Sequence, residues 1–129
     1  MAFVVEHIGI MAAAPLAMAA WYERVLGFET RASSENGGSA NAFVADAGGT
    51  MLEFGKNPGA ETLAERLTDP LQFHIALKSD DIEADALRLA AEGAIRLGDV
   101  RTTAKGDRLL LLKDPWGNTL QLAQRAGKR

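Results

Sequence analysis

The pattern of apolar and polar residues in the first part of the chain predicts a strand, a helix and a second strand, in that order. Phe3–Ile10 is rich in β-branched residues and predicts a buried strand. Pro15–Leu26 is rich in alanine and predicts a helix, because proline suits the first helical turn and Gly27 suits the position after the last one. Phe28–Ala32 then predicts a short strand, and the polar segment Ser33–Ser39 predicts a loop that could act as a mobile lid.

Two further strands complete this pattern. Ala40–Asp46 and Thr50–Gly55 predict a hairpin around the glycine-bearing turn Ala47-Gly48-Gly49. A connector, Lys56–Pro70, follows, with a helical turn predicted at Glu61–Leu67. The first half of the chain therefore predicts the order βαβββ.

The second half predicts the same order again. Leu71–Lys78 predicts a strand, and Asp81–Glu92 predicts a helix with Asp80 as its N-cap and Gly93 as its terminator. Three more strands follow, with a turn between the last two. Their predicted ranges are Ala94–Leu97, Arg108–Lys113 and Thr119–Ala123, with the turn at Asp114–Asn118.

Landmarks in the two halves are separated by nearly one offset, which indicates a duplication. The pairs are His7 and His74 (67 residues apart), Gly27 and Gly93 (66 apart), and Glu53 and Gln121 (68 apart). We therefore predict an α+β protein with one domain over residues 1–129. It would consist of module 1 (about 1–56) and module 2 (about 70–125), related by a pseudo-twofold axis, with a helix covering one face of each sheet.

Strand alternation places one polar side chain opposite the apolar face of each of four strands. These residues are His7, Glu53, His74 and Gln121, and they include both histidines of the chain. A lone strand histidine is usually a packed residue, and Glu53 alone could face solvent. Two imidazoles and a carboxylate are nevertheless the three ligands that a catalytic metal site requires, with the Gln121 amide oxygen as a weak fourth.

Composition narrows the functional classes. The 129 residues are 47% hydrophobic and 24% charged, as in an ordinary globular domain. A net charge of −3 without a basic run argues against a nucleic-acid or membrane partner. The absence of cysteine excludes disulfides, zinc–thiolate sites and cysteine nucleophiles. Because the N-terminus does not resemble a signal peptide, the expected location is cytoplasmic.

An ordered set of motifs resembles the vicinal-oxygen-chelate superfamily, which includes glyoxalase I, bleomycin-resistance proteins and extradiol dioxygenases. The motifs are His7-Ile8-Gly9-Ile10, Trp21-Tyr22 through Leu26-Gly27-Phe28, Leu52-Glu53-Phe54, Phe73-His74-Ile75-Ala76-Leu77, and Asp114-Pro115-Trp116-Gly117-Asn118 leading into Leu120-Gln121-Leu122. The resemblance implies paired βαβββ modules that form a cup-shaped sheet. It also implies a homodimer, in which each cup is sometimes completed by two chains.

The resemblance assigns the metal ligands to His7, Glu53, His74 and Gln121, with Zn, Ni, Mn, Co or Fe as the divalent ion. It implies a metal-dependent lyase or isomerase of the glyoxalase I type that acts on a small oxygen-rich substrate. The family's metal enzymes commonly carry glutamate at the last position, and the neutral Gln121 cannot act as a base. Glu53 is then the candidate base. The alternatives are a metal-free binding protein of the bleomycin-resistance type, and a dioxygenase or thiol transferase of the same superfamily. The substrate-binding residues remain unknown at this stage.

Overall fold

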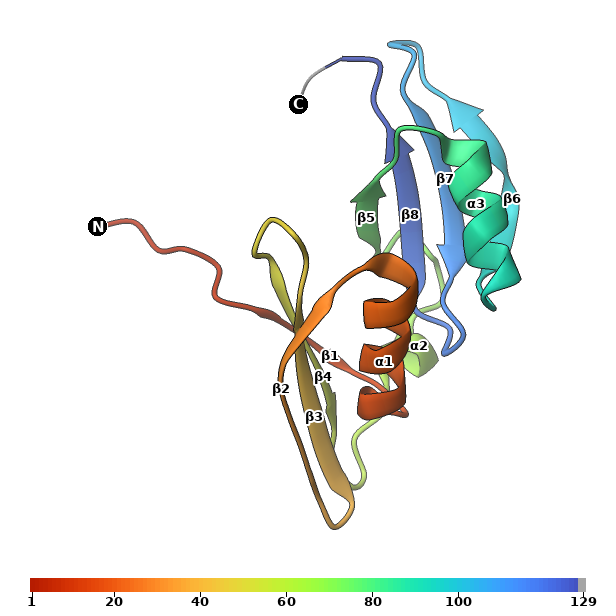
Figure 1. The fold of residues 1–129 in the computed structure, drawn as a ribbon. Helices are drawn as coiled ribbons and strands as arrows, with labels where there is room; N and C mark the ends of the chain where they lie inside the picture. Colours follow the sequence, from red (N-terminus) through yellow and green to blue (C-terminus); the bar gives the residue numbers. More distant parts are fainter. Residues whose placement is uncertain (128–129) are drawn as a thin grey trace. The chain divides into compact units, whose positions relative to one another are not determined.

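The computed structural model describes residues 1–127, and the chain divides into two compact units, Met1–Arg66 and Leu67–Arg129. Each unit contains one four-stranded mixed sheet with a helix after its first strand (Figure 1). The prediction of an α+β protein built from two βαβββ modules is therefore confirmed. No helix within residues 1–127 has the length and apolar character needed to cross a membrane.

Unit 1 has the strand order β1-β4-β3-β2, with β1 parallel to β4 and the other neighbours antiparallel. Its elements are β1 (Ile8–Met11), α1 (Pro15–Leu26), β2 (Glu29–Asn36), β3 (Ser39–Ala45), β4 (Met51–Lys56) and the short α2 (Leu63–Arg66). Because β1 and β4 are parallel, the crossover between them carries α1 and the β2–β3 hairpin.

Unit 2 repeats this topology with the order β5-β8-β7-β6, and β5 is parallel to β8. Its elements are β5 (Ile75–Lys78), α3 (Ile82–Ala91), β6 (Ile95–Thr102), β7 (Arg108–Lys113) and β8 (Thr119–Gln124). The duplication inferred from the spacing of landmarks is thus present in the strand pairing of both units.

Helix α1 begins and ends where the sequence predicts. Pro15 occupies its first turn, and Gly27 ends it with φ 76°, a left-handed conformation that costs glycine no Cβ clash. Tyr22 is fully buried on the inner face of the helix and packs edge-on against Phe54 of β4, with ring centroids 4.9 Å apart. Burial of each such aromatic ring contributes about 2–3 kcal/mol to folding. The opposite face of the unit 1 sheet is therefore left for polar side chains.

Helix α3 begins one residue later than predicted. Asp81, not Asp80, is the N-cap, and its side chain accepts a hydrogen bond from the backbone N–H of Ala84 at 3.2 Å. The reason is the position of Ile82, which is fully buried as the first helical residue. Helix α3 then buries Ala86 and Leu89 one and two turns later, as the 3.6-residue period requires.

The first strand of each unit is shorter than predicted. Strand β1 begins at Ile8, which is paired with Leu52, the second residue of β4, so the partner strand extends only one residue beyond this pair. Strand β5 begins in the same way at Ile75, which is paired with Leu120, the second residue of β8. Each of the two histidines therefore lies immediately before its strand and not within it.

The second strand of each unit is longer than predicted. Strand β2 extends through most of the segment Ser33–Ser39, so the prediction of a loop there is wrong, and the hairpin turns at Gly37 with φ 62°. Polar residues tolerate this position because β2 is an exposed edge strand. Strand β6 continues to Thr102 past an irregularity between Leu97 and Arg101.

Candidate functional site

The open face of the unit 1 sheet brings His7 and Glu53 together. Gly9 of β1 is paired with Glu53 of β4, and alternation turns the side chain of His7, two residues earlier, to the same face. The Nε2 atom of His7 lies 3.4 Å from Oε1 of Glu53, and the two side chains are 35% and 28% exposed. The predicted neighbours are thus in contact within one unit, and they are accessible to a small ligand.

The electrostatic surroundings favour the protonated form of His7. A hydrogen bond from Nδ1 to the Glu6 carboxylate is the main reason why the pKa of His7 is raised above its ordinary value. The negative charges of Glu6 and Glu53 act in the same direction, while partial desolvation opposes them. Since an imidazole must be neutral to bind a metal, a proton competes with an ion for Nε2.

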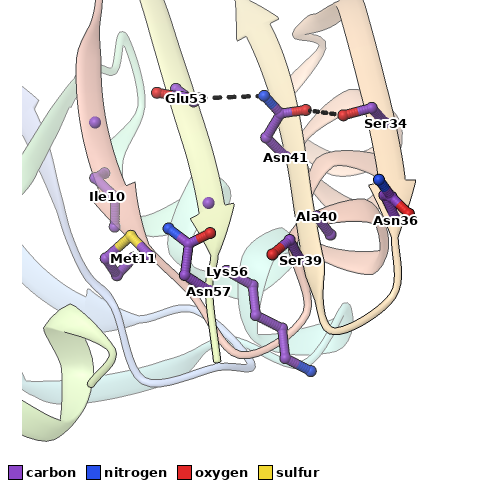
Figure 2. A pocket seen from close by; sticks show the side chains of 12 residues that line it. Ile10, Met11, Ser34, Asn36, Ser39, Ala40, Asn41, Glu53, Lys56 and Asn57 are labelled. Atoms are coloured by element: carbon purple, nitrogen blue, oxygen red, sulfur yellow. Dashed lines mark hydrogen bonds between the residues drawn. The ribbon is translucent and has the colours of Figure 1, made fainter. Parts of the chain in front are cut away.

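Glu53 is held on its other side by a chain of hydrogen bonds that crosses the sheet (Figure 2). Asn41 of β3 donates from Nδ2 to Oε2 of Glu53 at 3.3 Å. Ser34 of β2 donates from its hydroxyl to Oδ1 of Asn41 at 2.6 Å. The chain leaves Oε1 of Glu53 directed at His7, and it fixes the orientation of the carboxylate as second-sphere partners do in metal sites.

A pocket of about 440 Å³ adjoins Glu53 on this face (Figure 2). Its walls come from all four strands of unit 1 and from the residue after β4. The lining residues are Gly9, Ile10, Met11, Ser34, Asn36, Ser39, Ala40, Asn41, Glu53, Gly55, Lys56 and Asn57. The volume is within the range of about 300–1,000 Å³ that is usual for small-molecule sites.

Unit 2 carries the equivalent pair in a different environment. Ala76 of β5 is paired with Gln121 of β8, so His74 and Gln121 have the same register relation as His7 and Glu53. Gln121 is buried, with 7% of its surface exposed. The Nδ1 atom of His74 is also buried and has no hydrogen-bond partner within residues 1–127. A buried ring nitrogen without a partner is unusual, because its desolvation is left uncompensated.

The chemistry of the four candidate side chains shows whether they suit a divalent ion. Within neither unit, over residues 1–127, do three His, Asp or Glu side chains gather into a metal-binding group. Each unit supplies two donors, one imidazole with one carboxylate or amide oxygen. Together these are the nitrogen and oxygen ligands that suit first-row divalent ions, and the orphaned nitrogen of His74 is consistent with a ligand role.

Sequence reasoning did not identify Asn41 or Ser34. Ser34 lies in the segment that was predicted as a loop, and Asn41 lies in a segment that was predicted as a strand without a role for this side chain. The signal that could have found Asn41 is alternation, since it shares the sheet face of Phe43, which is paired with Glu53. The edge of the His7 ring lies against Phe43, with centroids 5.3 Å apart.

Comparisons with known proteins agree with this architecture. The family described as a glyoxalase-like domain matches residues 7–123 of the chain. A search of curated proteins gave no match. Among solved structures, a glyoxalase family protein from Bacillus cereus has a TM-score of 0.80 and 15% sequence identity, over 98% of this chain and 97% of that chain.

Two other solved structures have a similar fold. A glyoxylase/bleomycin resistance protein/dioxygenase domain from Frankia sp. has a TM-score of 0.73 and 18% identity, over 99% of this chain and 96% of that chain. A glyoxalase I mutant from Zea mays has a TM-score of 0.71 and 19% identity, over 95% of this chain and 45% of that chain. The chain therefore belongs to the glyoxalase-like domain family, and its structural neighbours are members of the vicinal-oxygen-chelate superfamily.

Proposed function

We propose that this protein binds a divalent metal ion and acts as a lyase or isomerase on a small oxygen-rich substrate. The observation that carries the proposal is the pair formed by His7 Nε2 and Glu53 Oε1, 3.4 Å apart on an accessible sheet face beside a pocket. An imidazole and a carboxylate in this arrangement can turn to the same ion without a change in the backbone.

The proposed ligands are two from each unit, His7 and Glu53 with His74 and Gln121. The donors are two imidazoles, one carboxylate and one amide oxygen, so Zn, Ni, Co, Mn and Fe are all suitable ions. The proposal includes that both modules act as one domain over residues 1–129 and that the protein is a homodimer. The two pairs of ligands would come from one chain or from two.

A bound ion would polarise a substrate carbonyl as a Lewis acid. Glu53 is the side chain that would accept a proton from the carbon next to that carbonyl, because Gln121 has no useful proton affinity. Asn41 would keep Oε2 of Glu53 occupied, so that Oε1 is the basic atom. A single carboxylate would then hold the proton between its removal and its return.

Metal analysis of the full-length protein, purified without an affinity tag, tests the proposal. We expect a stoichiometric divalent ion in the wild type and its loss in His74→Ala, with the circular dichroism spectrum unchanged. Lys105→Ala, an exposed substitution in the β6–β7 turn, is the control and should retain the ion. Absence of metal from the wild type after incubation with each candidate ion would contradict the proposal.

The second candidate is a metal-free binding protein, and the neutral Gln121 and the raised pKa of His7 favour it. The two candidates differ in whether ligand binding depends on metal. A screen of α-ketoaldehyde–thiol adducts for turnover would support the enzyme. Ligand binding that is unchanged by EDTA, without turnover, would support the binding protein. Oxygen uptake with catechols would identify a dioxygenase instead.

A further inference from the structure

The pocket beside Glu53 is lined mainly by uncharged side chains that can form hydrogen bonds. The residues of this kind are Ser34, Asn36, Ser39, Asn41 and Asn57. An amide has two donor hydrogens and an acceptor oxygen, and a hydroxyl has both roles. Asn41 and Ser34 already use part of this capacity in their bonds to Glu53 and to each other. Hydroxyl groups on a ligand also have both roles, so this lining matches a ligand that carries several of them.

No aromatic ring is present among the described residues that line the pocket. Trp21 and Tyr22 belong to α1, and their rings are buried in the core, where they contact each other. A flat aromatic ligand would therefore have no stacking partner in this pocket. The lining favours an aliphatic ligand.

Lys56 provides the one positive charge of the lining, and it is free to bind an anion. The side chain is exposed, and within residues 1–127 it forms no ion pair. Figure 2 shows it pointing away from Glu53, toward the turn of the β2–β3 hairpin. Since strand residues rise by about 3.3 Å each, Lys56 and Glu53 are about 10 Å apart along β4. Because Lys56 alternates with Gly55 and Asn57, its side chain leaves the other side of the strand, and it borders the pocket at the rim where β4 ends.

The floor of the pocket is kept open by two glycines on the same face. A Cβ atom at Gly55 would lie 3.5 Å from the sulfur of Met11, and one at Gly9 would lie 3.8 Å from Oε1 of Glu53. These are ordinary contact distances, so a small side chain would fit and would occupy ligand space. Because glycine has no side chain, Gly9 and Gly55 make the pocket deeper than other residues would.

We propose that this pocket binds a short aliphatic hydroxycarboxylate. The carboxylate of the ligand pairs with Lys56, and its hydroxyl groups bond to the amides of Asn36, Asn41 and Asn57. The oxygen-bearing end farthest from the carboxylate reaches Glu53. This inference rests on the proposed function for assigning ligand binding to the site, and it adds the chemical class of the ligand.

Three six-carbon probes test each part of the recognition separately. D-gluconate carries both hydroxyls and a carboxylate, sorbitol lacks the carboxylate, and hexanoate lacks the hydroxyls. Binding is measured by NMR on the full-length, EDTA-treated protein. We expect D-gluconate to bind at least about tenfold more tightly than either other probe, since each lacks one group of bonds. The side-chain amide signals of Asn36, Asn41 and Asn57 should shift on binding.

Matched variants locate the carboxylate contact. Lys56→Met should weaken D-gluconate binding about tenfold or more and leave sorbitol binding unchanged, because only the charged group is affected. Lys105→Met removes an exposed lysine far along the chain and should change neither. Equal affinity for all three probes, or an effect of Lys56→Met below about twofold, would overturn the inference.

The outcome of this probe-binding experiment does not depend on the outcome of the metal analysis. If the wild type lacks metal but selects D-gluconate through Lys56, the proposed function fails and the ligand class stands. If the wild type holds a stoichiometric ion but shows no preference for D-gluconate, the ligand class is wrong and the metal assignment stands. Gly55→Val offers a further check, since filling the floor should abolish D-gluconate binding while the fold is retained.

Discussion

The two units have the same topology but present chemically different pairs at equivalent positions. In unit 1 a partly exposed histidine meets a carboxylate that is fixed by Asn41. In unit 2 the corresponding histidine has a buried, unpartnered Nδ1, and the corresponding side chain is the neutral, buried Gln121. The two units therefore share the positions of these side chains, but only unit 1 has a negatively charged side chain at the second position of the pair.

From this difference we infer that the two repeats have different chemical roles in the proposed site. Under the proposed function, the Glu53 carboxylate of unit 1 would both bind an ion and hold a proton, and the polar pocket lies beside it. Unit 2 has the uncharged, buried amide of Gln121 at the position of that carboxylate. Substitutions that make the two units alike therefore test the account.

The largest effect is expected from Glu53→Gln, which gives unit 1 the same histidine–glutamine pair as unit 2. Loss of the only anionic donor should weaken metal binding by about a hundredfold or more, since even loss of a second-sphere partner costs 10–100-fold. Competition with a chromophoric chelator measures the change. Glu35→Gln, on the exposed strand β2, is the matched control and should have no effect. Retention of wild-type affinity in Glu53→Gln would exclude this residue as a ligand.

A second comparison concerns the turns before β4 and β8. Asp46 accepts hydrogen bonds from the backbone N–H groups of Gly48 and Thr50, and Asp114 does the same for Trp116 and Asn118. The two aspartates are 68 residues apart, the offset that also separates Glu53 from Gln121. Asp114 is 1% exposed, whereas Asp46 is only partly buried.

Asp114→Ala should therefore destabilise the protein more than Asp46→Ala. Removing the buried carboxylate leaves several donors unsatisfied, including the Asn118 side-chain amide, and should lower the free energy of unfolding by about 3 kcal/mol. The more exposed donors at Asp46 can bind water instead, so about 1 kcal/mol is expected there. Urea denaturation of both variants gives the values. Equal losses would show that burial does not distinguish the two turns.

Gln121→Glu makes the opposite change, because it gives unit 2 the same pair as unit 1. An anionic donor should tighten metal binding by about tenfold, or about 1.4 kcal/mol. Without metal, the buried carboxylate should lower the melting temperature. The expected signature is a larger rise in melting temperature on metal addition than in the wild type. A variant that responds to metal no more than the wild type would contradict the assignment of Gln121.

The smallest effect on stability is expected from the polar contact that joins the helix to the sheet in each unit. The hydroxyl and backbone N–H of Thr30 hold the pKa of Glu23 below its ordinary value, whereas Glu83 of unit 2 pairs with Arg96 at 3.2 Å. A lowered pKa in the folded state means that Glu23 stabilises the protein above its ordinary pKa, and that this contribution disappears as the pH falls through the lowered value.

Wild type and Glu23→Gln should therefore differ in stability at pH 6 and converge near pH 3. Urea denaturation at the two pH values measures the difference. Glu83→Gln should instead show a salt-dependent difference at pH 6, because it removes an exposed ion pair. A Glu23→Gln difference that persists at pH 3 would show that the contact acts through packing and not through charge.

The sequence predicted those elements whose limits are set by local chemistry. Helix α1 was predicted correctly because Pro15 and Gly27 mark its ends, and β7 because Arg108–Lys113 is an apolar run. The limits of β1 and β5 were wrong because they depend on where the partner strands begin, which is not encoded locally. The second half of β2 was missed because its residues are polar and only pairing with β3 makes the segment a strand.

The candidate site was predictable to the extent that it follows the duplication. Spacing and alternation alone could find the four side chains His7, Glu53, His74 and Gln121, and the structure places Nε2 of His7 3.4 Å from Oε1 of Glu53. Their role as metal ligands stays a prediction. Alternation could have placed Asn41 on the face of Glu53, but the pocket that Asn41 and Lys56 line could not be found in this way, because it depends on the register of the strands.

X-ray absorption spectroscopy of the metal-loaded, full-length protein is the strongest test of the proposal that the imidazoles of His7 and His74 bind one ion. We expect the ion in the wild type to have two imidazole nitrogens together with oxygen donors as its ligands. In His7→Ala we expect one imidazole ligand. A shell with no imidazole, or with one in the wild type, would contradict it.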